Sequence, residues 1–103
     1  MELRVLNYFL TVAREENFTR AAEQLHVTQP TLSRQIAELE AELGVKLFKR
    51  GSHNIMLTDD GMLLKRRAQE IVSLAERTKQ DFLCKEENIE GTVSIGSGEF
   101  LST

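Results

Sequence analysis

Apolar residues recur at every third or fourth position over the first part of the chain, a spacing typical of helices with one buried face. The pattern predicts three helices, over residues 2–15, 20–26 and 29–43. We expect these helices and the segment that follows them to share one core, formed by Leu3, Phe9, Leu25, Leu32, Ile36, Leu39 and Phe48.

The ends of these helices carry typical capping residues. Thr19 and Thr28 precede the second and third helices, where a hydroxyl can accept an orphan backbone N–H. Pro30 falls in the first turn of the third helix, where its missing N–H is harmless. Gly44 follows the last apolar residue of that helix, where a left-handed residue is expected.

The apolar pattern changes after Gly44. Two short apolar runs, over residues 45–48 and 55–57, flank the turn-forming cluster Gly51–Asn54. This arrangement is typical of a β-hairpin. Thr58 then stands where it can cap a fourth helix.

The fourth predicted helix is long, because the chain has no proline after Thr58 and no glycine between Gly61 and Gly91. Its length would be roughly 40 Å. Apolar or small residues alternate steps of four and three along it, as in a coiled coil. A helix extending from a small domain cannot bury such a seam alone, so we expect a partner helix, most simply from a second copy of the chain. The predicted dimerisation residues are Leu64, Ala68, Ile71, Ala75, Thr78 and Phe82.

Residues 91–96 alternate like the opening of a strand, but too few residues follow to build a sheet around it. We therefore expect residues 91–103 to be the first strand of a further domain that is otherwise absent. The chain is then most simply a piece of a longer protein. A naturally short protein is the alternative.

The composition is that of a globular protein, with 41% hydrophobic and 28% charged residues. No apolar run is long enough for a membrane helix or for the core of a signal peptide. Cys84 is the single cysteine, so no internal disulfide is expected. These features favour a cytoplasmic protein without a membrane partner.

The net charge of −3 argues mildly against nucleic acid as a partner. However, residues 1–58 hold seven basic and seven acidic side chains, so the whole excess of negative charge lies in residues 59–103. The stretch between Leu43 and Thr58 is basic and contains no acid. The total charge therefore does not decide the question.

The second and third helices have the lengths and the short connection of a helix-turn-helix. The first half of the third helix offers groups that bond to base edges or phosphate, whereas its glutamates are confined to the second half. The candidate DNA-binding residues on it are Thr28, Gln29, Thr31, Ser33 and Arg34. Two roles stay open for Thr28: a contact with DNA, or a helix cap alone. Arg20, near the start of the second helix, is a candidate phosphate contact.

The hairpin adds a second basic element. Lys49 and Arg50 flank its turn, and His53 lies within it. A two-stranded wing with such a tip can reach the backbone or the minor groove beside the recognition helix. Arg50 is the better candidate, because its planar guanidinium suits phosphate and a narrow groove.

Several stretches together resemble the LysR-type transcriptional regulators. They are Phe18–Ile36, Leu39-Glu40, Leu43-Gly44, Leu47–Arg50 and Leu57–Gly61. The resemblance runs from about Leu3 to Ile95, nearly the whole chain, and the motifs are specific in combination.

The resemblance implies a mainly α-helical chain with a definite plan. A winged helix-turn-helix DNA-binding domain of three helices and a short hairpin occupies residues 1–58, and a dimerising linker helix occupies residues 59–90. The resemblance also implies that Arg50 lies on the wing against DNA, and that residues 59–88 pair, antiparallel, with a partner copy. The residues it places in the major groove are Gln29, Pro30, Thr31, Ser33 and Arg34.

The same resemblance implies a bacterial, sequence-specific regulator that binds a pseudo-palindromic promoter site as a dimer. A small-molecule co-inducer is expected for the full-length protein, sensed by the absent C-terminal domain, with RNA polymerase as a further partner. No cofactor and no metal are expected in these 103 residues.

A protein-interaction module that uses the seam of the long helix to bind a different coiled-coil partner is the alternative, and it predicts a monomer. An enzyme is not expected, because the sequence shows no nucleophile–base pairing and no phosphate-cradling glycine loop. Asp59 and Asp60 are adjacent, so they are acids of a helix start and not a facing carboxylate pair.

Overall fold

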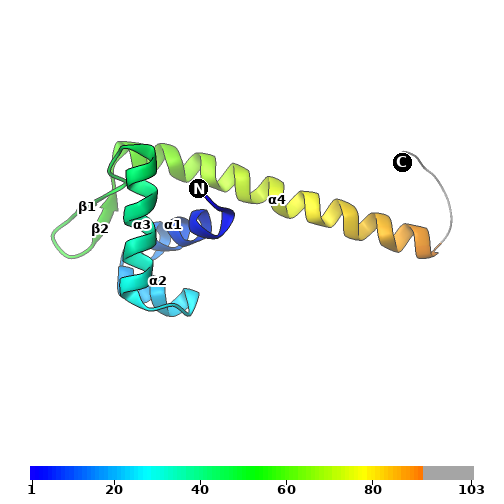
Figure 1. Ribbon diagram of the computed structural model, residues 1–103, viewed down its shortest axis with the longest axis horizontal. Coiled ribbons are helices and arrows are strands. Elements are labelled where there is room, and N and C mark those ends of the chain that lie inside the picture. Colours follow the sequence, from blue (N-terminus) through cyan, green and yellow to red (C-terminus); the bar gives the residue numbers. More distant parts are fainter. Residues whose placement is uncertain (92–103) are drawn as a thin grey trace. The chain divides into compact units, whose positions relative to one another are not determined.

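The computed structural model describes residues 1–91, and the side chains of residues 1–84. Residues Met1–Val72 form one compact unit, and a second unit begins at Ser73. The predicted three helices, hairpin and long helix are confirmed (Figure 1). The elements are α1 (Leu3–Glu15), α2 (Phe18–Leu25), α3 (Gln29–Leu43), β1 (Phe48–Arg50), β2 (Ile55–Leu57) and α4 (Asp59–Gly91).

Helix α2 begins earlier than the sequence pattern predicts. The side chain of Asn17 accepts a hydrogen bond from the backbone N–H of Arg20 at 2.8 Å. The prediction of Thr19 as the N-cap is therefore wrong, and Thr19 lies inside the helix. The earlier start places Phe18 in the first turn, where its ring packs edge-on against Phe48 with the ring centroids 5.8 Å apart.

The predicted ends of α3 are confirmed. The Thr28 side chain accepts a hydrogen bond from the backbone N–H of Thr31 at 3.3 Å. At the other end Gly44 has a φ of 72°, in the left-handed region that glycine adopts without steric cost. His26, in the short turn before α3, is also left-handed, with a φ of 59° although it carries a Cβ, and its backbone N–H donates to the carbonyl oxygen of Glu23 at 3.3 Å.

The core of the first unit lies between α1, α2 and α3 and includes one face of the first turns of α4. Its fully buried large side chains are Leu6, Phe9, Val12, Leu32, Leu39 and Leu47. Phe48 packs from the wing onto Phe9, with the ring centroids 5.4 Å apart. The prediction of Leu3 as a core residue is wrong: 47% of its surface is exposed, because it lies in the first turn of α1 at the edge of the helix packing.

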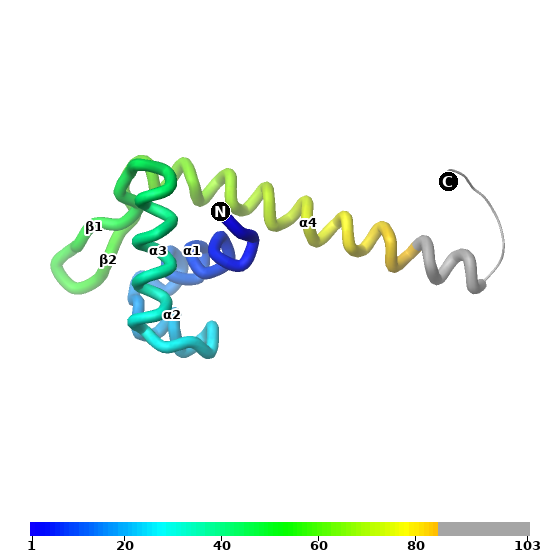
Figure 2. The backbone as a smooth tube through the Cα atoms, viewed as in Figure 1, coloured from blue at the N-terminus to red at the C-terminus, as the bar shows by residue number. Residues whose placement is uncertain are grey.

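The wing is a two-stranded antiparallel hairpin, shown to the left of α3 in Figure 2. Its register pairs Phe48 with Leu57 and Arg50 with Ile55. At the tip, the backbone N–H of Gly51 donates to the carbonyl oxygen of Asn54 at 2.7 Å and closes the turn. The basic residues therefore lie at the end of β1 that is farthest from the core.

The start of α4 is fixed to the base of the wing. The hydroxyl of Thr58 accepts from the backbone N–H of Gly61 at 3.0 Å and donates to the carbonyl oxygen of Lys46 at 2.5 Å, so the predicted cap is confirmed. Gly61 is buried against the carbonyl oxygen of Leu47. The helix can lie this close only because Gly61 has no side chain.

This close packing corrects part of the predicted dimerisation seam. Leu64 is 9% exposed and Ala68 is fully buried, and both belong to the core of the first unit. These two residues are therefore not free to meet a partner helix. The heptad pattern did not show this, because a seam buried against the domain itself has the same spacing as one buried in a coiled coil.

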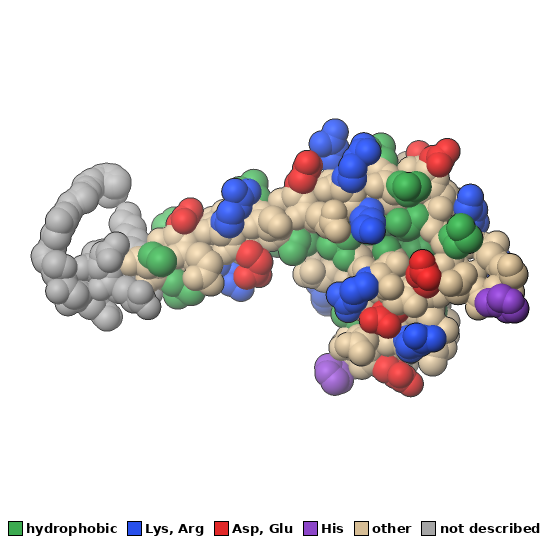
Figure 3. Space-filling view, turned by 180° about the vertical axis from the view of Figure 1, so that it is seen from behind, with side chains coloured by type: hydrophobic (Ala, Val, Ile, Leu, Met, Phe, Trp, Pro, Cys, Tyr) green, Lys and Arg blue, Asp and Glu red, His purple; other side chains and the backbone are tan. Residues whose placement is uncertain are grey.

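The later part of the seam is different. Ile71, Thr78 and Phe82 are exposed, and Ala75 is half-buried. Hydrophobic side chains interrupt the charged surface along α4 (Figure 3), and Leu74 and Leu83 are exposed together with Phe82. The predicted strand after Gly91 lies outside the described residues. No helix in the described part of the chain is both long and apolar enough to cross a membrane.

Candidate nucleic-acid interface

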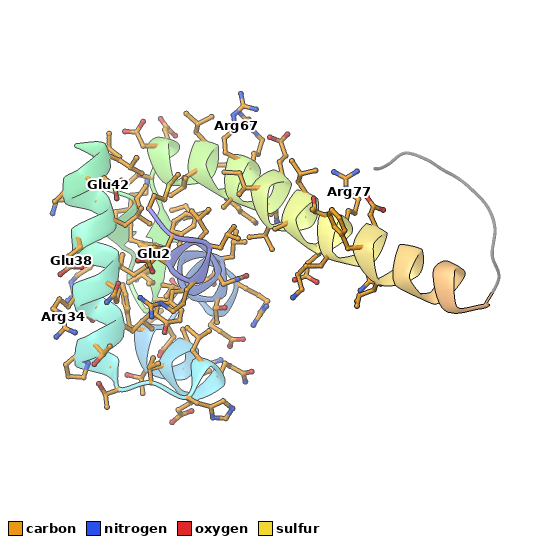
Figure 4. The ribbon with its side chains drawn as sticks, turned by 45° about the vertical axis from the view of Figure 1, so that its right-hand side comes forward. Glu2, Arg34, Glu38, Glu42, Arg67 and Arg77 are labelled. Carbon is orange, nitrogen blue, oxygen red and sulfur yellow. The ribbon has the colours of Figure 1, made fainter. Side chains whose placement is uncertain are left out.

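The outer face of α3 changes from hydrogen-bonding and basic groups to acidic groups along its length. Arg34, Glu38 and Glu42 project from successive turns on one side of the helix (Figure 4). Gln29 and Pro30 are also exposed in the first turn, while Thr31 and Ser33 are half-buried. The partial positive charge of the helix N-terminus adds to Arg34 at the same end. This end of α3 is therefore suited to an anion.

The polar side chains of the first turn are held by one another. The Gln29 amide nitrogen donates to the Ser33 hydroxyl at 2.8 Å, which leaves the amide oxygen and one amide N–H of Gln29 available. The Thr28 hydroxyl donates to the Thr31 hydroxyl at 2.8 Å while it caps the helix. Thr28 is thus engaged in both of its hydrogen-bonding roles inside the protein.

The wing presents two exposed cations, Lys49 and Arg50. Within the part of the chain whose side chains are described, neither lies within ion-pair distance of a carboxylate. Lys46, at the base of the wing, lies 4.0 Å from a Glu40 carboxylate oxygen. Lys49 and Arg50 are therefore free of ion pairs within the described side chains.

An open groove of about 740 Å³ lies between α3, the start of α2 and the wing. It brings together Gln29 and Ser33 from α3 with Lys49 and Arg50 from the wing. Thr19, at the start of α2, lines it as well. The remaining predicted site residues, Arg20, Thr28, Pro30, Thr31 and Arg34, lie outside this lining. The carboxylates of Glu16 and Glu40 also line it, and they accept hydrogen bonds from Asn54 and Leu47 within the protein. The cations and the neutral hydrogen-bonding groups on this concave surface suit a polyanion with readable edges.

Sequence reasoning missed the residues that hold the wing against the helices. Glu40 is only 15% exposed in its side chain, and its carboxylate accepts from the backbone N–H of Leu47 at 2.7 Å. On the other side, the Glu16 carboxylate accepts from the side-chain amide of Asn54 at 2.9 Å. Glu16 and Asn54 are 38 positions apart, so no local pattern could have paired them.

The three-helix core, the hairpin and their shared groove define a winged helix-turn-helix domain. A family model described as "Bacterial regulatory helix-turn-helix protein, lysR family" matches residues 3–62, more than half of the chain. The chain belongs to this family of bacterial regulatory proteins.

Curated relatives agree with the family model. The HTH-type transcriptional regulator BsdA of Bacillus subtilis is 43% identical over 98 residues, which are 94% of this chain and 34% of BsdA. The HTH-type transcriptional regulator BudR of Klebsiella aerogenes is 42% identical over 96 residues, which are 93% of this chain and 67% of BudR. The chain thus spans about a third of the length of BsdA.

Solved structures share the fold. The crystal structure of the CbnR_DBD–DNA complex has a TM-score of 0.78 and 41% identity, and it covers 84% of this chain and 99% of that chain. The BenM_DBD/catB site 1 DNA complex has a TM-score of 0.77 and 38% identity, with 85% and 97% covered. In both cases nearly the whole of the solved chain is matched.

Proposed function

We propose that this chain is the DNA-binding part of a bacterial transcription regulator that acts in the cytoplasm and binds a specific double-stranded DNA site as a homodimer. The observation that carries the proposal is the single groove that joins the polar first turn of α3 to the cations of the wing. Relatives of similar sequence are transcriptional regulators, and similar structures hold DNA.

We assign the roles of individual residues from their contacts. Arg34 and Gln29 suit guanine and adenine edges in the major groove, with Ser33 and Thr31 beside them and Pro30 adding an apolar contact. Thr28 is assigned to the helix cap, because both of its hydrogen-bonding roles are taken up within the protein. Lys49, Arg50 and Arg20 suit phosphate, and Arg50 also suits a narrow minor groove.

A twofold dimer requires a pseudo-palindromic site, with half-sites about one helical turn of DNA apart or a multiple of it. The later residues of the predicted seam on α4, which are Ile71, Ala75, Thr78 and Phe82, supply the dimer contact in this proposal. Binding of a small-molecule co-inducer and contact with RNA polymerase would belong to parts of a longer regulator beyond this chain.

The proposal is tested by selecting duplexes from a randomised pool with the 103-residue chain. We expect an enriched sequence with twofold symmetry, bound tightly by fluorescence anisotropy at low salt. The preference over a scrambled duplex should persist as salt is raised, although the affinity itself falls steeply because several phosphates are neutralised. If all duplexes were bound equally and added salt abolished this binding, sequence-specific recognition would be contradicted.

The dimer is tested separately by Phe82→Glu, since 63% of the Phe82 surface is exposed and the residue lies outside the core of the first unit. We expect sedimentation velocity to show a dimer for the wild type and a monomer for this variant, because a charge buried in an apolar interface is costly. The unfolding midpoint of the residue 1–72 unit should change little.

Arg77→Glu is the matched control for Phe82→Glu, because it introduces a glutamate five positions away, which the repeat of 3.6 residues per turn places on another face of the same helix; Arg77 is labelled in Figure 4. It should leave the dimer intact. A monomeric wild type would contradict the homodimer and favour a different coiled-coil partner for α4.

A further inference from the structure

We propose that Glu16 is a positioning residue for DNA recognition: through Asn54 it holds the tip of the wing against the turn between α1 and α2, and so fixes the spacing between Arg50 and α3. The inference rests on the proposed DNA-binding function. It concerns a residue that carries the same sign of charge as the DNA and lies outside the recognition helix.

The contact is formed by both the side chain and the backbone of Glu16. Its carboxylate accepts from the Asn54 side-chain amide at 2.9 Å, and its carbonyl oxygen accepts from the backbone N–H of Ile55 at 3.3 Å. Asn54 is also the residue whose carbonyl oxygen closes the wing turn by accepting from Gly51. Glu16 therefore holds the wing at the turn itself. The bonded residue, Asn54, is four residues from Arg50 along the chain.

The wing needs such support because it is small. Each strand has three residues, and an isolated two-stranded hairpin is marginally stable in water. Its base is well fixed, by Glu40 to Leu47 and by the packing of Phe48 on Phe9 and Phe18. The tip carries the cations. Among the hydrogen bonds and ion pairs of the described side chains, the contact with Glu16 is the one that links this tip to the helices.

The same two-residue turn also sets the start of α2. Glu16 has a left-handed φ of 56°, and the next residue, Asn17, caps α2. Two adjacent residues therefore fix both the position of the wing tip and the start of the helix-turn-helix. A bidentate contact in the major groove and an arginine contact from the wing can both form only if their separation matches the DNA.

The competing explanation is that Glu16 acts only by its charge. A carboxylate close to a DNA-binding groove repels phosphate, so its removal in any form would then strengthen binding. The positioning role instead predicts that one variant, Glu16→Ala, binds DNA more weakly than the wild type. Glu16→Gln keeps an acceptor for Asn54 while it removes the charge, whereas Glu16→Ala removes both.

The experiment measures the affinity of the 103-residue chain and its variants for the duplex that the wild type selects. For Glu16→Ala we expect a loss of about three- to tenfold for each half-site, the range that one net hydrogen bond is worth. Glu16→Gln should bind at least as tightly as the wild type. Asn54→Ala, which leaves the Glu16 charge in place, should lose about as much as Glu16→Ala, and the double variant no more than either single one.

Coupling to Arg50 separates positioning from a general loss of structure. Arg50→Ala should lower the affinity by a clearly smaller factor in the Glu16→Ala background than in the wild type, although no hydrogen bond or ion pair of the described side chains joins Glu16 to Arg50. Arg34→Ala should lower the affinity for DNA by the same factor in both backgrounds. Melting curves confirm that each variant is folded.

Two results would overturn the inference: tighter binding by both Glu16 variants, or equal costs of Arg50→Ala in the two backgrounds. A wild type that selects no sequence would instead contradict the proposed function itself. The two failures are therefore distinguishable in the same set of titrations.

Discussion

Arg34→Ala is expected to weaken specific DNA binding more than any other single change on the surface of this protein. Arg34 is exposed on the basic half of α3 and has no ion-pair partner among the described side chains. An arginine that reads a base contributes about 1–3 kcal/mol, and a twofold dimer presents it twice, so the loss would be roughly twice that. Anisotropy titrations against the selected duplex measure it.

Arg34→Lys separates base reading from a phosphate contact. Lysine keeps the charge but lacks the planar fork that bonds two acceptors of guanine. If Arg34 reads a base, the lysine variant should lose discrimination at one position of each half-site while its binding to scrambled DNA stays near the wild-type value. If lysine restores specific binding fully, Arg34 contacts phosphate and the assignment to a base is wrong.

Arg14→Ala is the control for Arg34→Ala, since it removes the same charge from α1 and not from the first half of α3; Arg14 lies beside Glu15. It should change affinity only slightly and equally for all duplexes. Equal losses in the two variants would mean that the protein recognises DNA through its overall charge alone.

Gly61→Ala is expected to destabilise the first unit by about 2 kcal/mol, although alanine is the better helix former by about 1 kcal/mol. A Cβ at this position would overlap the carbonyl oxygen of Leu47 and lie 2.9 Å from a methyl carbon of Leu57. The Leu47 oxygen is backbone, and it accepts a hydrogen bond from Thr58 at 3.0 Å, so it cannot move freely. Overpacking against such a group costs about 1–3 kcal/mol or more.

Thermal unfolding measures this effect, and a loss of about 10 °C in the midpoint is expected for a unit of this size. Gly44→Ala is the control, because a Cβ there meets no atom within 4 Å and only the left-handed φ of 72° opposes it. It should cost about 1 kcal/mol and leave the wing in place. An unchanged or raised midpoint for Gly61→Ala would show that α4 can move away from Leu47 at no cost.

Much of the fold follows from local rules that the sequence displays. The periodicity of three and four predicts α1, α2 and α3 because each helix must bury one face, and Gly44 and Thr28 mark the ends of α3 through backbone geometry and capping alone. The hairpin follows from a turn cluster between two apolar runs. The one wrong cap arose because Asn17 and Thr19 both suit the position, and only the packing of Phe18 on Phe48 distinguishes them.

The candidate site, too, could be predicted from the sequence only in part. Gln29, Ser33 and Arg34, in the first half of α3, could be chosen from the sequence because a helix exposes them by its own repeat. The sequence also marks Lys49 and Arg50 as the basic end of a hairpin. It contains no measure of how far that hairpin lies from α3, and the shared groove appears only in three dimensions.

The sequence by itself determined the order and type of the elements and the chemistry of the recognition face, because these depend on neighbours within one helix or one turn. The tertiary structure decided which contacts join distant segments. It placed Leu64 and Ala68 in the core of the domain and not in a partner interface, and it joined Glu16 to Asn54 and Glu40 to Leu47. The physical reason is that a periodic pattern states which face of a helix is buried, whereas only packing decides what buries it.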